Sequence, residues 1–186
     1  MNATELLTTR ASCGKLVDDA PDPETLRFAL EAAARAPDHG GLKPLRIRWI
    51  RGAALERFGE LMAESVRSGN PGATAEELDR ARRKALRAPL VLVVGAAVKP
   101  HPHIPEIEQV LSVGAATYAI MLALHARGYA AIWRTGDMAY DASIKRAFEF
   151  NETDALIGFL YVGTAKRTGA TLQRAKPEDF ASEWLG

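Results

Sequence analysis

The sequence predicts a mixed α/β domain in which helices cover both faces of a central sheet. Three features support this fold class: a continuous apolar run at residues 90–97, an alternation of helix-like and strand-like segments, and a long helix at residues 106–127 that is apolar almost all round. The apolar run is typical of a strand buried on both faces. A chain of 186 residues is most simply one domain, residues 1–186, which can bury about 70% of its unfolded surface.

Each predicted helix depends on its periodicity and on its end signals. Asp22 can cap the second helix and Pro37 ends it, while Thr74 and Glu77 form a capping box for the fourth. The first helix is expected to turn its two leucines, residues 6 and 7, inward. In chain order, we predict helices at residues 3–9, 22–36, 54–66, 74–87, 106–127 and 141–148. Strands are predicted from apolar or alternating runs at residues 45–50, 90–97, 129–133 and 155–163.

Composition limits the classes of partner. The 24 basic and 23 acidic residues leave a net charge of +1, so no overall field favours nucleic acid or an anionic membrane. The fourth helix does carry a basic run, but no aromatic residues interleave it for base stacking, and we interpret most of these charges as a solvated helix face. The run consists of Arg80, Arg82, Arg83, Lys84 and Arg87.

Cysteine usage and hydropathy indicate a location. The single cysteine, Cys13, cannot form an internal disulfide. The first residues lack the basic segment and apolar core of a secretory signal, and no uncharged apolar run reaches the roughly 18 residues of a membrane helix. We therefore expect a cytoplasmic protein that binds small molecules or protein, with no membrane and no nucleic acid as partner.

Cation-capable side chains occur in two loops near the amino terminus. Arg10 and Ser12 offer paired donors and a hydroxyl to an anion, although a solvated basic loop has the same composition. Arg35 and His39 flank the break after the second helix, where consecutive glycines permit close approach of a ligand. The alternative for this second loop is a helix terminator with incidental polar residues.

A third candidate lies at the end of the strand at residues 129–133. Trp133, Arg134 and Thr135 place an aromatic plane, a cation and a hydroxyl at the carboxyl end of that strand, where ligand crevices form in α/β sheets. A buried tryptophan beside a chance arginine is the alternative. His101 and His103 with Glu106 and Glu108 do not match usual ligand spacings, so we expect no metal.

Motifs that would name a reaction are absent. The sequence contains no dinucleotide-binding glycine fingerprint after a strand, no P-loop and no Gly-x-Ser-x-Gly elbow. The helix at residues 106–127 is too apolar for a chain this small to surround, which indicates a subunit interface. Phe180 and Trp184 in the terminal tail also need burial, and we expect the tail, from about residue 165 to 186, to pack on a second subunit.

Nearly the whole chain, in order, resembles the short YdjA-like subgroup of the flavin-dependent nitroreductase family. Arg-Ala-Pro-Asp-His at residues 35–39 and Ile-Trp-Arg at 132–134 are specific to this subgroup, whereas Arg-x-Ser at 10–12 is common to the family. Further similar positions are Glu5-Leu-Leu7, Pro44, Glu56-Arg-Phe58, Arg87-Ala-Pro-Leu90, Glu108-Gln109, Gly128, Gly136, Gly158-Phe-Leu-Tyr161 and Gly163-Thr164.

The resemblance implies an intertwined homodimer that holds FMN at its interface. NAD(P)H would serve as a transient co-substrate and a nitroaromatic, quinone or similar molecule as acceptor. The flavin would carry the chemistry, so no catalytic side chain is expected. The resemblance assigns FMN binding to Arg10, Ala11 and Ser12 of one subunit, to Arg35 and His39 of the other, and to Trp133, Arg134 and Thr135.

Three departures from the family pattern leave alternatives open. Ala11 stands where relatives often carry a second arginine, Gly14 stands where many larger members carry a basic residue near the flavin, and Gly40 with Gly41 softens the loop after His39. Lys15 is a candidate substitute for the basic residue. The alternatives are a non-catalytic FMN-storage or sensing protein, and a dehalogenase or flavin-fragmenting oxidoreductase of the same fold.

Overall fold

The computed structural model describes residues 1–17, 19–166 and 174–186, and its architecture is built on strand β3 (Leu90–Ala96), all of whose residues are buried. β2 (Leu45–Arg51) and β5 (Ala155–Ala165) pair with the two edges of β3. β4 (Ala130–Arg134) and the short β1 (Leu16–Val17) both pair with the far edge of β5. These five strands form one antiparallel sheet. The four predicted strands are confirmed, whereas β1 was not predicted.

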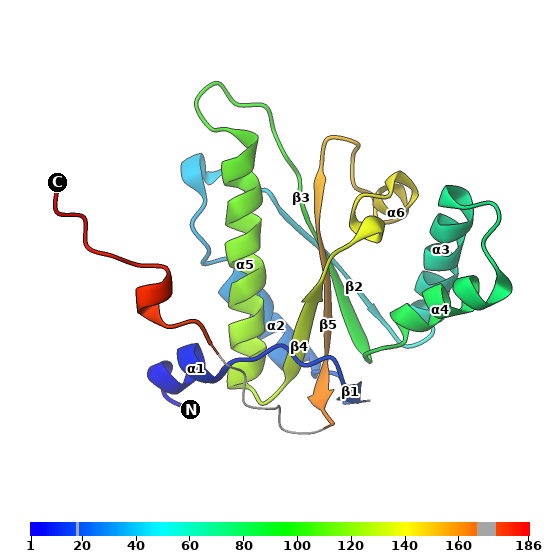
Figure 1. Cartoon of the computed structure of the whole chain (residues 1–186), viewed down its shortest axis with the longest axis horizontal. Helices are drawn as coiled ribbons and strands as arrows, with labels where there is room; N and C mark the ends of the chain where they lie inside the picture. The colour runs from blue at the N-terminus through cyan, green and yellow to red at the C-terminus, as the bar shows by residue number, and fades with distance from the viewer. Residues whose placement is uncertain (18, 167–173) are drawn as a thin grey trace.

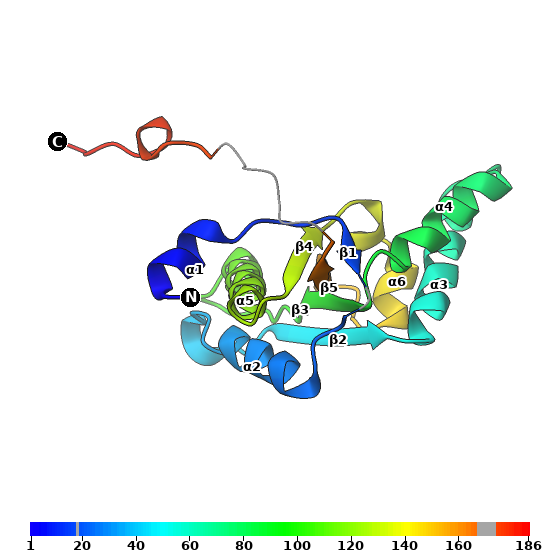
Figure 2. The same ribbon diagram turned by 90° about the horizontal axis from the view of Figure 1, so that it is seen from below.

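Helices cover both faces of the sheet, as predicted (Figures 1 and 2). On one side lie α1 (Ala3–Thr9), α2 (Pro23–Ala33) and α5 (Glu106–Ala126). On the other side lie α3 (Ala54–Gly69), α4 (Ala75–Ala85) and α6 (Ala142–Ala147). Three short 3₁₀ helices complete the described elements: η1 (His39–Gly41), η2 (Asp137–Ala139) and η3 (Pro177–Asp179).

Alternation along β3 explains why one strand supports two cores. Leu92 and Val94 belong to the apolar cluster that includes α2 and α5. Val91 and Val93 point the other way, into the cluster under α3, α4 and α6. Successive side chains of a strand point to opposite faces, so an uninterrupted apolar run is needed when both faces are covered.

Helix α5 is buried on one side only in the single chain. Val113, Ile120 and Leu124 pack fully buried against the sheet. Ile107, Leu111 and Tyr118 are exposed, Leu111 to 63%. By length and composition alone α5 is able to cross a membrane, but its buried side makes it a core helix of this fold. The single chain therefore covers one side of this apolar helix and leaves the other side exposed.

The inward orientation predicted for both leucines of α1 is wrong for one of them. Leu6 is half-buried, whereas Leu7 is 60% exposed. The seven-residue helix contacts α5 along one side, where Thr9 Oγ1 lies 3.0 Å from Nε2 of His125. Adjacent residues of a helix point in different directions, so a helix that packs along one side can bury only one of two neighbouring leucines.

In the described part of the tail, Arg174 donates from Nη2 to the Arg10 carbonyl over 2.9 Å, and the residues after it extend away from the body of the molecule (Figures 1 and 2). Phe180, Trp184 and Leu185 are exposed there, Trp184 to 88%. The first part of the predicted packing segment, residues 167–173, lies outside the described residues. In the single chain, the apolar side chains of the tail therefore have no covering surface.

The packing of Phe150 on strand β3 generates a test of the fold. A register shift between Val94 and Gly95 accompanies this contact, and a methyl group at position 95 would overlap the buried Phe150 ring. We expect Gly95→Ala to lower the free energy of unfolding by about 1–3 kcal/mol in urea titrations. Gly69→Ala is the control, because no atom lies within 4 Å of the added methyl group. Equal stability of the two variants would contradict this packing.

Candidate functional site

The free edge of β4 brings two of the predicted segments together. Ser12 forms a parallel bridge with Ala131, and the Cys13 amide donates to the Ala131 carbonyl over 3.1 Å. A methyl group at Gly14 would lie 3.5 Å from Nη2 of Arg134. Residues 12–14 therefore run beside residues 131–134, which brings the first and third candidate segments next to each other.

Trp133 is held between β5 and α5. Its indole Nε1 donates a hydrogen bond to the Ile157 carbonyl at 3.1 Å. Gly158, with φ of 143°, leaves no side chain in the way, and the far edge of the indole faces Gly114 of α5. The ring thus forms a wall of the site with a defined orientation.

Two arginines at this strand carry nitrogen atoms without partners. Arg10 lies with its guanidinium 5.5 Å from the centre of the Tyr118 ring, yet its Nε and Nη1 are buried and donate to no acceptor among the described residues. Nε of Arg134 is likewise buried and has no acceptor among the described residues. Buried donors without acceptors cost about 1–3 kcal/mol each, more when charged. Such donors are suited to an acceptor-rich, anionic ligand.

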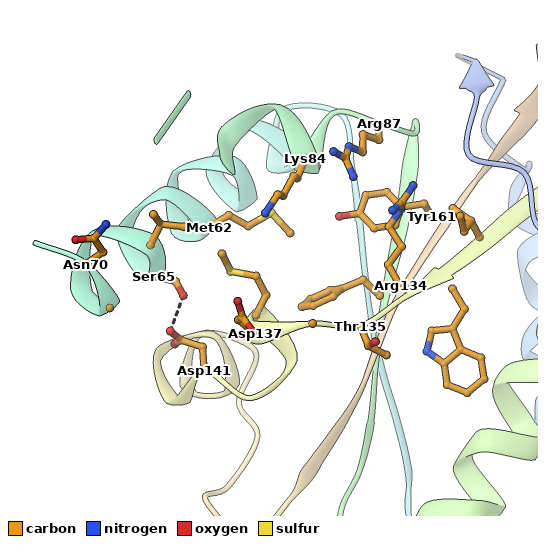
Figure 3. A pocket seen from close by; sticks show the side chains of 17 residues that line it. Met62, Ser65, Asn70, Lys84, Arg87, Arg134, Thr135, Asp137, Asp141 and Tyr161 are labelled. Atoms are coloured by element: carbon orange, nitrogen blue, oxygen red, sulfur yellow. Dashed lines mark hydrogen bonds between the residues drawn. The ribbon is translucent and has the colours of Figure 1, made fainter. Parts of the chain in front are cut away.

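A cavity of about 790 Å³ opens on the α3, α4 and α6 side of β4 (Figure 3). Its volume falls within the range of small-molecule sites. Arg134 and Thr135 line it together with Lys84 and Arg87, which were not predicted as site residues. The lining from α3, α4 and the residues that directly follow these helices consists of Met62, Ser65, Val66, Gly69, Asn70, Lys84 and Arg87.

The basic run of α4 divides into two groups. Arg82 forms ion pairs with Glu60 and Asp79 on the surface, and Arg83 is exposed. Lys84 and Arg87 instead line the cavity. The solvated-face interpretation therefore describes most of the run, but it missed that the half-buried Lys84 and the exposed Arg87 also line a cavity. Their three-residue spacing was the available signal that they share a side.

Arg35 and His39 lie apart from the other predicted residues. Arg35 is exposed after the end of α2, and Nδ1 of His39 is 2.6 Å from Oε2 of Glu108 near the start of α5. Arg10 contacts the same helix at Tyr118. Ten helical residues separate the two contacts, which corresponds to about 15 Å along the axis. Within one chain, the two groups are not brought together.

A carboxylate joins α3 to α6 at the far end of the cavity (Figure 3). Asp141 accepts hydrogen bonds from the hydroxyls of Ser65 and Ser143, each at 2.5 Å, and caps α6. Burial raises the pKa of Asp141, but the hydrogen bonds from Ser143, Ser65 and the Ile144 amide together outweigh burial and lower it. The ionised form is therefore favoured in the folded protein.

The lowered pKa of Asp141 predicts a pH-dependent contribution to stability. A carboxyl group with a lowered folded-state pKa stabilises fully above its unfolded pKa and loses this contribution as the pH falls through its folded value. We expect Asp141→Ala to lower the free energy of unfolding by about 1–2 kcal/mol at pH 7. The deficit should shrink below about pH 4.

Urea titrations at several pH values measure this deficit. Asp137→Ala is the matched control, because Asp137 lines the same cavity but its carboxylate makes no hydrogen bond to the described residues. A deficit for Asp141→Ala that stayed constant down to pH 2.5, or an equal deficit in the control, would contradict the role of the charged form.

Comparisons with known proteins identify the family of this chain. The model of the nitroreductase family matches residues 7–164. YdjA of Escherichia coli (strain K12), provisionally named an NAD(P)H nitroreductase, is 35% identical over 171 residues, which are 92% of each chain.

Solved structures share the fold at low sequence identity. A nitroreductase-like family protein from Bacillus cereus aligns with a TM-score of 0.85 at 18% identity, covering 100% of this chain and 97% of that one. The FMN and NADPH-dependent nitroreductase NfnB from Sphigopyxis sp. strain HMH aligns with a TM-score of 0.78 at 19% identity over 100% of both chains. On the family model and the YdjA identity, this chain belongs to the nitroreductase family.

Proposed function

We propose that this protein is an FMN-dependent NAD(P)H oxidoreductase of nitroreductase type. The observation that carries the proposal is the set of buried guanidinium nitrogens, on Arg10 and Arg134, that have no partner in the part of the chain that the structure describes. A flavin mononucleotide presents a phosphate and a ring rich in acceptors, which would satisfy such donors. The names of NfnB and YdjA support the same cofactor and reductant.

In this proposal, the segment at residues 10–12 holds the phosphate and ribityl side. Arg10 supplies forked donors, Ser12 a hydroxyl, and Ala11 its backbone amide. Ser12 is exposed beside the free edge of β4, so its hydroxyl is accessible to a ligand lying along that edge.

The other three assigned residues would orient the ring. Trp133 is the wall held by β5, Arg134 places positive charge at the cavity, and Thr135 adds a hydroxyl. FMN held by these residues would supply the hydride and electron chemistry between NAD(P)H and a nitroaromatic, quinone or similar acceptor. The chain itself then needs to bind and orient, and no side chain has to act as a nucleophile.

We further propose that Arg35 and His39 complete the site of a partner chain in a homodimer. The exposed residues Ile107, Leu111 and Tyr118 lie on one side of α5, and a second copy packed antiparallel on this side would bring the Glu108 end of one helix toward the Tyr118 end of the other. His39 would thereby approach the Arg10 segment of its partner. The two groups that one chain keeps apart would meet across the interface.

The tail belongs to the same proposal. Phe180, Trp184 and Leu185 are exposed in the single chain and extend away from its body. Packing on the partner subunit would remove this apolar surface from water, which favours association. The cytoplasm is the proposed compartment, because Cys13 is a free thiol.

Purified protein should be yellow, or should take up added FMN, and should bleach anaerobically with NADH or NADPH. Absorbance spectra under argon measure both steps, and reoxidation by a nitroaromatic or quinone completes the cycle. Colourless protein that does not take up FMN would contradict the proposal. Bound flavin that resists both nicotinamides would indicate a flavin-storage or sensing protein instead.

The split site is testable with two variants that damage opposite halves. Arg10→Ala and Arg35→Ala should each weaken FMN binding by about tenfold or more, because each removes one charge-assisted contact. Co-expression with two affinity tags yields the heterodimer of the two variants. One of its sites carries both substitutions and the other neither, so a flavin titration should recover one tight site per dimer.

The heterodimer also serves as the folding control, since recovery requires both variant chains to be folded. If both groups belonged to one chain's own site, every site in the heterodimer would carry one substitution and none would bind tightly. That result, or an unchanged affinity in Arg35→Ala, would contradict the proposed arrangement.

A further inference from the structure

One end of the cavity gathers four hydrogen-bond donors from three elements. Lys84 and Arg87 come from α4 and the turn after it, Arg134 from β4 and Tyr161 from β5. Figure 3 shows their polar ends turned toward one another, with Ser65, Asn70 and Asp141 toward the opposite end. The donors thus form a positively charged end of an otherwise mixed cavity.

None of the three cations is neutralised within the described residues. No carboxylate lies within 4.0 Å of the charged nitrogens of Lys84, Arg87 or Arg134, although Asp137 lines the same cavity. By contrast, Arg82 on the same helix has two carboxylate partners. Like charges held together without counter-ions repel one another, and an anionic ligand would relieve that repulsion.

Tyr161 adds a donor at the floor of this end. The residue is only 2% exposed, and its hydroxyl makes no hydrogen bond to the part of the chain that the structure describes. Burial raises the pKa of the phenol, while Arg87 and Arg134 oppose the rise. The phenol therefore stays protonated at neutral pH and can donate to an anion.

We propose that Lys84, Arg87 and Tyr161 form a subsite for the carboxylate of the electron acceptor, so that the protein prefers acidic aromatic acceptors. The inference rests on the proposed function, because it takes β4 as the edge along which the flavin lies. Arg134 is close to both regions: its Nη2 lies 3.5 Å from where a methyl group at Gly14 would be, and its side chain lines the cavity. A ring held by its carboxylate at this end would therefore lie beside the flavin segment.

The 2′-phosphate of NADPH is the competing anion, and the depth of the subsite disfavours it. In a dinucleotide, the phosphate lies far from the reacting nicotinamide ring. Here the innermost donor, Tyr161, is buried and pairs with Ile132 of β4, whereas Lys84 is half-buried and Arg87 is exposed. A compact aromatic acid carries its carboxylate on the same ring as its reacting group. Its carboxylate could therefore bind at Tyr161 while the ring lies beside β4.

Benzoate and benzamide are matched probes, because they differ in charge but hardly in shape. Calorimetry on the FMN-saturated protein should give about tenfold tighter binding of benzoate, the factor expected for one charge-assisted contact. Arg87→Gln should remove most of this preference and Arg87→Lys should retain it. Arg83→Gln should also retain it, since Arg83 is an exposed cation of the same helix outside the cavity.

Turnover gives an independent measurement of the same preference. The ratio of kcat/KM for 4-nitrobenzoate to that for 4-nitrobenzamide should fall about tenfold in Arg87→Gln and stay at the wild-type value in Arg83→Gln. Comparing ratios between variants cancels the different intrinsic reactivity of the two nitro compounds.

Four results would overturn the inference: equal affinity for benzoate and benzamide, an equal loss in Arg83→Gln, displacement of FMN by benzoate, or a rise in KM for NADPH alone in Arg87→Gln. Displacement would assign the cations to the flavin, and the NADPH effect would assign them to the nucleotide. If the protein takes up no FMN, the proposed function fails, but an Arg87-dependent preference for benzoate in that protein would still support the subsite.

Discussion

The contact between Trp133 and strand β5 determines the geometry of the candidate site. The indole donates to the Ile157 carbonyl, and a methyl group at Gly158 would come within 2.7 Å of Nε1 and 2.5 Å of the Arg134 carbonyl. β4 can approach β5 at this point only because residue 158 has no side chain. One edge of β4 is thereby held, while its other edge receives residues 12 and 13, and Arg134 at its end lines the cavity.

The sequence predicted those helices and strands that are specified by residues within or next to the element itself. Asp22 accepts from the Thr25 amide at 2.7 Å, and Thr74 with Glu77 makes both bonds of a capping box. The apolar run of β3 likewise specifies a strand covered on both sides. β1 had no such signal, because its two residues are strand only through pairing with Thr164 and Ala165 at the far end of β5. Short strands of this kind depend on partners distant in sequence.

The candidate site was only partly predicted, because it too depends on contacts between residues that are distant in sequence. Arg10 and Ser12 were matched to Trp133 through family resemblance, since nothing in the local pattern shows that residue 12 pairs with residue 131. Lys84 and Arg87 were missed because helical periodicity marks a polar side without showing whether water or a cavity lies opposite it. That distinction follows from the position of α4 beside the ends of β4 and β5, which is a property of the fold.

Many larger family members carry a basic residue at the position of Gly14, and here a cation from β4 lies beside that position. Gly14 has no side chain, and Nη2 of Arg134 occupies the space beside it, 3.5 Å from where a methyl group would lie. Lys15 is exposed, and its carbonyl accepts from the Lys166 amide as part of the β1 pairing. In the proposed flavin site, Arg134 rather than Lys15 is therefore the cation that compensates for Gly14. Because Arg134 follows Trp133 directly, the contact at Gly158 controls the position of this charge as well as that of the indole.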